Sequence, residues 1–288
     1  MDLHSLEYFR KVAELEHVTK AAEQLHVAQP SLSRTISNLE AELGVSLFDR
    51  SGKKIVLNQY GEAVLKHAKR ILKETEDIYS EIREMKGDQM SSVSVSVQAA
   101  SKLMTQFIIE FQNKYPDIAL HLTLGRSNEE CDLTVTSSIH RPEDPDSVIL
   151  LQEELLLAVP KNDPLAEKKH VRLSDTKDMK FIALEKGKNL RIAADAYCRM
   201  AGIEPDIILE SDSPDTVRGL VQAGLGICFI PSVTWTDLNY DNFVLKEIEY
   251  PHCYRYINLS WRGGGYQSAA VKTMRADIIR FFKNVIKQ

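Results

Sequence analysis

The chain has 288 residues, of which 43% are hydrophobic and 27% charged, and its formal net charge is −5. These values are typical of a globular protein with two or three domains. The sequence excludes an integral membrane protein built of helices, because no apolar run approaches the roughly 20 residues that span a bilayer. The first ten residues indicate a capped amphipathic helix and not a secretory signal, so we expect a cytoplasmic protein.

The N-terminal region predicts three short helices. An amphipathic helix is predicted over 5–16, and Thr19 is the predicted N-cap of a second short helix. A third helix opens at Gln29 with Pro30 in its first turn, where a missing N–H costs nothing. Gly44 is predicted to end this helix in a left-handed conformation.

The third helix has an apolar face and a polar face. Apolar residues at spacings of four, three and four predict the buried face, which consists of Leu32, Ile36, Leu39 and Leu43. The polar residues of the same helix are Ser31, Ser33, Arg34, Thr35 and Asn38. Two helices joined by a tight turn, the second with an outward polar face, predict a helix-turn-helix. In this motif Ala22 lies where the helices cross and Val27 fills the turn. His26 occupies a position where many such motifs have glycine, and histidine tolerates positive φ better than most residues.

Spacing alone leaves two interpretations of the polar face. In the first, it contacts DNA, because Gln pairs well with adenine, Arg pairs well with guanine, and hydroxyls bind phosphates. In the second, it is the solvated corner of a helical bundle. The near-neutral charge of the first 58 residues counts against DNA binding, although Arg50, Lys53 and Lys54 form a local basic cluster.

A wing and a long helix are predicted next. Residues 46–58 indicate two short strands around a Ser-Gly turn. Residues 61–86 contain no Pro or Gly after Gly61, and they carry a heptad seam. The seam consists of Val64, Ala68, Ile71, Thr75, Ile78, Ile82 and Met85. It favours an intermolecular coiled coil, and the alternative is a long surface helix packed on its own domain. Gly87-Asp88-Gln89 is the predicted domain boundary.

The remainder of the chain predicts an α/β fold, because strands alternate with helices. Strands are predicted at 93–97, 118–124, 132–136, 150–160, 180–184, 206–210 and 226–230. Helices are predicted at 101–115, 189–201, 214–223 and 267–286.

The run AAEQLHVAQPSLSRTISNLEAELGVSLFDR, residues 21–50, resembles the winged helix-turn-helix of LysR-type transcriptional regulators. FQNKYPDIALHL, ELLLAVPKNDPLA and VQAGLGICFIPS resemble that family's effector domain, so the resemblance covers essentially the whole chain. It implies a winged helix-turn-helix domain (1–60), a dimer-forming linker helix (61–87) and a bilobal α/β effector domain like a periplasmic binding protein (90–288). Lobe I is expected at about 90–160 and 267–288, and lobe II at about 161–266.

The resemblance implies DNA contacts for matching positions. Gln29, Pro30, Ser33 and Arg34 would lie at the groove-facing start of the recognition helix, beside Ser31 and Asn38. Thr19 would cap its helix and contact phosphate, and Lys53 at the wing tip would enter the minor groove. Arg50 would either contact DNA or support the base of the wing. The wing end departs from the family pattern, since LNQYGE stands where a Thr-Pro pair commonly precedes Gly-Glu.

The resemblance also implies an effector pocket between the two lobes. Its expected lining residues are Ala100, Ser101, Lys102, Arg126, Ser127, Thr136, Ser137, Asn189, Leu190, Arg191 and Gly226. Ser101 and Lys102 at a helix start, with Arg126 and Arg191 nearby, suggest a small anion such as a carboxylate. The alternative is that these cations are ordinary surface charges. The segment 126–130 is about three turns shorter than the family's, which affects both the expected dimer contact and the pocket's shape.

Other chemistries have less support in the sequence. The four cysteines, Cys131, Cys198, Cys228 and Cys253, form no C-x-x-C pair, which argues against a zinc site and fits reduced thiols. A thiol sensor, as in one branch of the family, is a further alternative for Cys198. No G-x-S-x-G, P-loop or dinucleotide fingerprint is present, so we expect no enzyme, cofactor or metal.

The sequence thus predicts a cytoplasmic bacterial regulator of the LysR type that binds an interrupted palindrome in double-stranded DNA. The expected partners are a small anionic effector, a second copy through residues 64–85, a tetramer of such chains and, as a candidate, RNA polymerase. One alternative is a small-molecule-binding or metabolic α/β protein whose helix-turn-helix serves protein contacts. Another is a regulator without any small effector.

Overall fold

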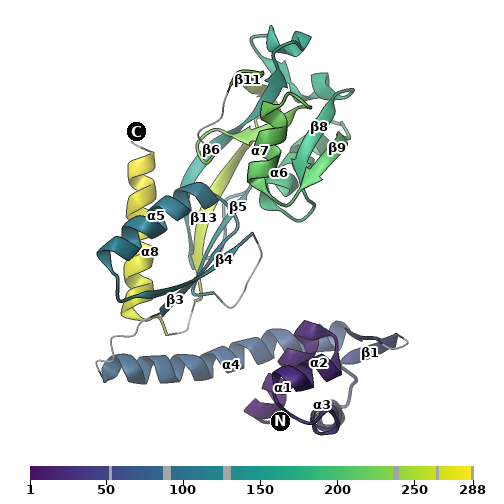
Figure 1. Ribbon diagram of the computed structural model, residues 1–288, viewed down its shortest axis with the longest axis vertical. Coiled ribbons are helices and arrows are strands. Elements are labelled where there is room, and N and C mark those ends of the chain that lie inside the picture. The colour runs from purple at the N-terminus through teal and green to yellow at the C-terminus, as the bar shows by residue number, and fades with distance from the viewer. Residues whose placement is uncertain (52–53, 87–91, 126–130, 236–239, 264–265, 287–288) are drawn as a thin grey trace. The chain divides into compact units, whose positions relative to one another are not determined.

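The computed structural model describes residues 1–51, 54–86, 92–125, 131–235, 240–263 and 266–286. Contacts between residues divide the chain into two compact units, Met1–Asp88 and Gln89–Gln288 (Figure 1). No helix in the described ranges is long and apolar enough to cross a membrane.

The N-terminal unit is a winged helix-turn-helix followed by a long helix. Its elements are α1 (Leu3–Leu15), α2 (Val18–Gln24), α3 (Gln29–Leu43), β1 (Phe48–Ser51), β2 (Lys54–Leu57) and α4 (Gln59–Met85). β1 and β2 pair antiparallel, which confirms the predicted wing strands. The three short helices surround a core in which Phe9, Leu32 and Leu39 are fully buried. Gly44 ends α3 at φ +73°, as predicted.

Two details of this unit differ from the sequence predictions. Thr19 is not the N-cap of α2: the N-cap lies two residues earlier, at His17, whose Nδ1 accepts a hydrogen bond from the Lys20 backbone N–H at 3.3 Å. Thr19 lies exposed within the first turn. Leu43 is exposed rather than buried, because only the first three residues of the apolar stripe reach the helical core.

Asn58 joins the wing to α4. Its Oδ1 accepts hydrogen bonds from the backbone N–H groups of Tyr60 and Gly61, each at 3.0 Å, and its Nδ2 donates to the Ser46 carbonyl at 2.9 Å. A Cβ atom at position 61 would overlap the carbonyl oxygen of Leu47, so this position requires glycine. The unusual LNQYGE sequence therefore still provides a capped helix start.

The second unit is α/β. Its strands are β3 (Ser92–Val97), β4 (Ala119–Leu124), β5 (Leu133–Ser138), β6 (Ser147–Pro160), β7 (Val171–Arg172), β8 (Lys180–Leu184), β9 (Asp206–Ser211), β10 (Cys228–Pro231), β11 (Phe243–Lys246), β12 (Ile248–Tyr250) and β13 (Tyr254–Trp261). Its helices are α5 (Ser101–Lys114), α6 (Asn189–Met200), α7 (Pro214–Gln222) and α8 (Ala269–Val285), with short 3-10 turns at Pro164–Ala166 and Leu173–Thr176. The main sheet has the order β10-β6-β13-β5-β3-β4, and β11 also pairs with β6.

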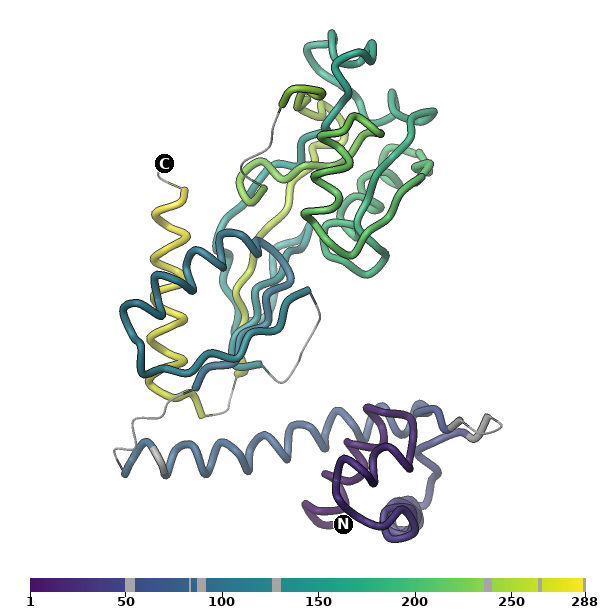
Figure 2. Tube along the Cα trace, in the orientation of Figure 1, coloured from purple at the N-terminus to yellow at the C-terminus, as the bar shows by residue number. Residues whose placement is uncertain are grey.

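Two hydrophobic cores define two lobes within this unit. The lobe I core gathers residues of β3, α5, β5 and α8, and the lobe II core gathers residues of β8, α6, α7 and β10. β6 contributes residues to both cores, and it runs antiparallel to β13 from one lobe to the other (Figures 1 and 2). Leu150 and Ile257 lie in the lobe I core, whereas Leu155 and Cys253 lie in the lobe II core. The change from the lobe I core to the lobe II core thus falls within β6 and directly before β13, an element that the sequence did not predict.

Candidate DNA-binding surface and effector site

The turn between α2 and α3 has the geometry that the sequence predicts. His26 adopts φ +55°, and the backbone N–H of Val27 donates to the Ala22 carbonyl at 3.0 Å. Ala22 is buried where the helices meet, and Val27 packs against the same core. This turn fixes the angle between α2 and α3, and therefore the direction in which the first residues of α3 face.

The outward face of α3 is polar and largely open to solvent. Its exposed residues are Gln29, Pro30, Ser31, Arg34 and Asn38, and Ser33 is half-buried. The Gln29 Nε2 donates to the Ser33 Oγ at 3.0 Å. The side chains of Arg34 and Asn38 make no hydrogen bond or ion pair within the described part of the chain, so their donor groups remain available to a ligand. The side chain of Arg50 and the whole of Lys53 lie outside the described residues.

The predicted seam on α4 divides into two parts. Val64 and Ala68 pack on the core of the N-terminal unit, as the surface-helix interpretation requires. Farther along, Ile78 and Met85 are 55% and 79% exposed, and Ile82 is exposed as well. A row of exposed apolar residues on one helix favours a partner helix.

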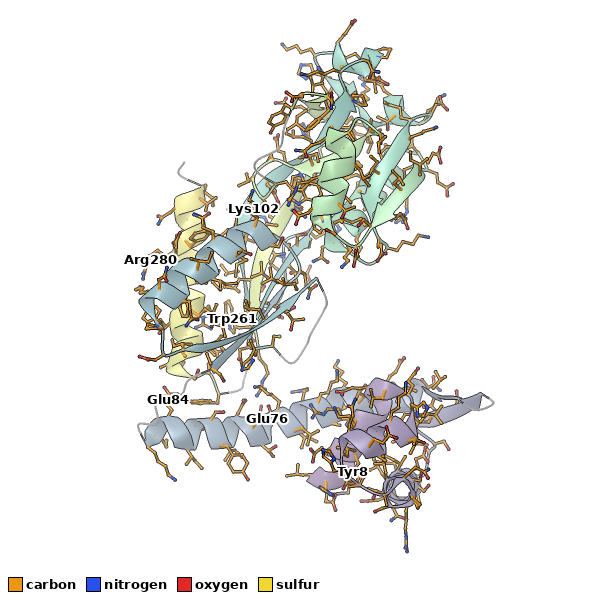
Figure 3. All side chains as sticks on the ribbon, in the orientation of Figure 1. Tyr8, Glu76, Glu84, Lys102, Trp261 and Arg280 are labelled. Atoms are coloured by element: carbon orange, nitrogen blue, oxygen red, sulfur yellow. The ribbon has the colours of Figure 1, made fainter. Side chains whose placement is uncertain are left out.

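The effector residues of lobe I lie at the carboxyl ends of parallel strands. β3 lies between β4 and β5 and is parallel to both. From β3 the chain continues to β4 on one side, and the next strand, β5, lies on the other side of β3. α/β sheets commonly bind ligands at such a switch point. Ala100 follows β3 at φ +54°, a strained conformation for a residue with a Cβ. Ser101 and Lys102 are exposed in the first turn of α5, where Figure 3 labels Lys102.

A buried polar network lies at the end of β5, beside the half-buried Thr136 and Ser137. Arg255 on β13 and Glu153 on β6 are direct cross-strand partners, and their side chains are only 3% and 0% exposed. The Arg255 Nε donates to Glu153 at 2.9 Å, Nη2 donates to the Thr234 Oγ1 at 2.9 Å, and Nη1 donates to the Ser137 Oγ at 3.3 Å. Sequence reasoning missed Arg255, Glu153 and Thr234.

The predicted effector residues of lobe II lie in different environments. Arg191 is 5% exposed, and its guanidinium donates to Asp195 at 2.7 Å, to the Leu184 carbonyl at 3.0 Å and to Glu210. Its charge is therefore neutralised within lobe II. Leu190 is part of the lobe II core, and Gly226 is explained by packing, since a Cβ there would lie 2.7 Å from the Lys180 carbonyl.

Asn189 differs from the other lobe II residues of this set, because its Nδ2 is buried and has no hydrogen-bond partner among the described residues. The preceding Lys188 was not predicted, and its Nζ donates to the Gly125 carbonyl of lobe I at 3.2 Å. Arg126 and Ser127 lie outside the described residues. At the junction of the lobes, Ser137 is thus hydrogen-bonded to Arg255, and Lys188 is hydrogen-bonded to Gly125.

All four cysteines are buried, and none of them forms a disulfide. Burial raises the pKa of Cys198, Cys228 and Cys253 to about 12, and Asp195 contributes to the raised pKa of Cys198. A reactive cysteine needs a lowered pKa and access to solvent, so these thiols have the character of inert core residues. Within the described ranges, no group of three His, Cys, Asp or Glu residues is arranged to hold a metal ion.

A winged helix-turn-helix followed by a two-lobed α/β domain is the architecture of a DNA-binding regulator with an effector-binding domain. Two family models match the chain: "Bacterial regulatory helix-turn-helix protein, lysR family" over residues 3–62 and "LysR substrate binding domain" over residues 91–282. The chain belongs to the LysR family, and it is a DNA-binding transcriptional regulator with an effector-binding domain.

Individual proteins resemble it along the whole chain or the second unit. An uncharacterized HTH-type transcriptional regulator of Bacillus subtilis, YybE, is 35% identical and covers 98% of this chain and 99% of its own. A full-length OxyR variant from Pseudomonas aeruginosa has a TM-score of 0.63 at 22% identity, covering 98% of this chain and 95% of its own. The effector-binding domain of QuiR in complex with shikimate has a TM-score of 0.57 at 23% identity, covering 68% of this chain and 98% of its own.

Proposed function

We propose that α3 recognises a specific sequence in the major groove of double-stranded DNA. The observation that carries this proposal is the exposed face of α3, where Arg34 and Asn38 hold unused donors above a buried apolar stripe. Gln29, Pro30, Ser31 and Ser33 would approach the bases and phosphates at the helix start, and Arg50 and Lys53 would add contacts from the wing. Thr19, exposed in the first turn of α2, would contact a phosphate.

The active form would be an oligomer. The exposed seam of α4 supports a homodimer, which would present two recognition helices to the two halves of an interrupted palindrome. Pairing of effector domains would then give a tetramer, and RNA polymerase is a candidate partner of the DNA-bound form. Such a protein would act in the cytoplasm.

Binding to DNA from the region beside its own gene tests the recognition surface. Arg34→Ala is expected to lower the affinity for the specific site by about 1–3 kcal/mol and to relax its sequence preference. Arg199→Ala removes the same charge from an exposed position on α6 and is expected to bind like the wild type. Equal affinities of all three proteins would contradict a recognition role for Arg34. Lys53→Ala is expected to weaken binding to all sequences and to reduce its salt dependence.

The effector is proposed to be a small carboxylate bound at the junction of the lobes. Donors from both lobes support it: Ser101 and Lys102 at the start of α5, and the unpartnered Asn189 Nδ2 at the start of α6. QuiR, whose domain has the same fold, binds shikimate, itself a small carboxylate. Because two carboxylates already neutralise Arg191, the proposal does not include that guanidinium.

A thermal-shift series with shikimate and other small carboxylates tests this proposal on the full-length protein. A binding compound is expected to raise the melting temperature of the wild type in a concentration-dependent way, and Ser101→Ala is expected to lessen that rise. If no carboxylate stabilises the wild type, the alternative of a regulator without a small anionic effector is favoured.

A further inference from the structure

Two polar contacts at the junction of the lobes, among the residues that the structure describes, differ in character. The first is the network of Glu153, Arg255 and Thr234 on the strands that run between the lobes. The second is the interlobe bond, in which the Lys188 Nζ of lobe II donates to the Gly125 carbonyl of lobe I at 3.2 Å. Lys188 directly precedes α6, and Gly125 directly follows β4.

The first contact is fixed. Glu153 accepts hydrogen bonds from the backbone N–H groups of Val233 and Thr234 at 3.0 and 2.8 Å, from the Thr234 hydroxyl at 2.8 Å and from Arg255. Separating these buried charges would leave one of them unpaired, which is strongly unfavourable. The strands β6 and β13 therefore form the end of the junction at which the lobes cannot part.

In the interlobe bond, by contrast, the Lys188 Nζ can exchange its acceptor. It is a single hydrogen bond at a partly exposed side chain, so water can replace the carbonyl at low cost. Gly125 is suited to this contact because it adopts φ +68°, and a Cβ there would lie only 3.1 Å from the Lys188 Nζ. Any change in the angle between the lobes would therefore break this bond before the buried network.

Within the described ranges, the charge of Lys188 has no carboxylate partner. No carboxylate in the described part of the chain lies within ion-pair distance of its Nζ, whereas Arg191 contacts two and Arg255 contacts one. An anionic acceptor adds a Coulomb attraction to the Lys188 ammonium that the neutral Gly125 carbonyl lacks. An anion that reached Lys188 would thus displace Gly125 favourably, and the unpartnered Nδ2 of the adjacent Asn189 offers a second donor.

We propose that Lys188 has two alternative acceptors: the Gly125 carbonyl, which holds the two lobes together without effector, and the anionic group of the effector. The second half of this proposal rests on the proposed carboxylate effector, whereas the first half does not.

Spin-label distances test the first half on the full-length protein. Labels at Asn113→Cys on α5 and Arg199→Cys on α6, both exposed positions, report the separation of the lobes. The buried native thiols leave these introduced cysteines as the reactive ones. Labelled chains are diluted into excess unlabelled protein, so that only distances within one chain are measured.

Lys188→Met is expected to shift the distance distribution to longer values and to broaden it, and Lys188→Arg is expected to restore it. Lys186→Met, which removes the same charge from an exposed neighbour, is the matched control and is expected to leave the distribution unchanged. Identical distributions for Lys188→Met and the wild type would overturn the interlobe bond as a constraint on the lobes.

Acetate is the probe for the second half. At equal ionic strength, replacing sodium chloride with sodium acetate is expected to raise the melting temperature of the wild type and of Lys186→Met more than that of Lys188→Met. Equal increases would overturn the anion-binding role of Lys188. Lys186→Met is expected to protect DNA like the wild type, so failure of this proposal is distinguishable from failure of DNA recognition.

Discussion

Arg255 and Glu153 show how a single pair of residues supports the effector domain. Replacing Arg255 with Met would leave the Glu153 carboxylate buried without its cation, and we expect the free energy of unfolding to fall by about 3–5 kcal/mol. Replacing both, as Glu153→Gln with Arg255→Met, removes both charges and keeps an acceptor oxygen for the backbone N–H groups of Val233 and Thr234, so we expect a smaller loss than in Arg255→Met. Urea unfolding followed by tryptophan fluorescence measures this difference. Equal losses in the single and double variants would contradict the assignment of the cost to an unpaired charge.

The buried thiols give a second prediction at the same scale. With a pKa of about 12, Cys198, Cys228 and Cys253 carry almost no thiolate at neutral pH. We therefore expect iodoacetamide to modify the native protein slowly and hydrogen peroxide to leave its DNA binding unchanged, as mass spectrometry and binding assays would record. Rapid oxidation of Cys198 in the native protein would favour the thiol-sensor alternative.

The same pKa shifts predict a pH dependence of stability. The thiols ionise near their ordinary value of 9.0 in the unfolded chain but only near 12 in the folded chain, so the unfolded chain loses protons first. The contribution of these thiols to stability is thus fully present below pH 9 and is lost as the pH rises from about 9 to 12. Urea midpoints measured across this range, with Cys228→Ala as the comparison, check the sign.

At the scale of elements, the start of α4 depends on Gly61. Gly61→Ala would force a Cβ against the Leu47 carbonyl, and we expect the N-terminal unit to lose about 1–3 kcal/mol of stability. Gly219 lies in α7 with open space around it, so Gly219→Ala is expected to stabilise its helix by about 0.5–1 kcal/mol. Thermal melts of both variants check the opposite signs, and a neutral Gly61→Ala would count against the close contact.

The exposed part of α4 predicts self-association through Ile78 and its neighbours. Ile78→Glu places a charge in the proposed seam and is expected to shift the protein toward monomers in sedimentation experiments. Leu225→Glu makes the same change at an exposed apolar residue outside α4 and is the matched control. An unchanged oligomer in Ile78→Glu would show that the dimer forms elsewhere.

The sequence predicted most elements because their apolar residues repeat with helical or strand periodicity. It missed β13, whose residues 255–259 are buried without alternation, so the segment YRYINLSW lacks the clear period of a half-exposed strand. The recognition face could be predicted because its residues lie within one helix. Glu153 and Arg255 could not be paired, because 102 residues separate them and only the folded sheet brings them together. Arg191 was predicted as a ligand because its carboxylate partners on α6 and β9 are visible only in the structure.

At the scale of the whole molecule, the N-terminal unit carries the proposed DNA surface and the second unit the proposed effector site. Each has its own core, so a change in one should leave the fold of the other intact. The central claim is that α3, presented twice by a dimer, contacts bases in an interrupted palindrome.

A footprint of the purified protein on the DNA beside its own gene tests this claim most directly, with Arg34→Ala as the comparison. We expect the wild type to protect two related half-sites at moderate salt and Arg34→Ala to lose that protection while keeping its fold. No protection by the wild type at either low or moderate salt, or equal protection by Arg34→Ala, would contradict the account.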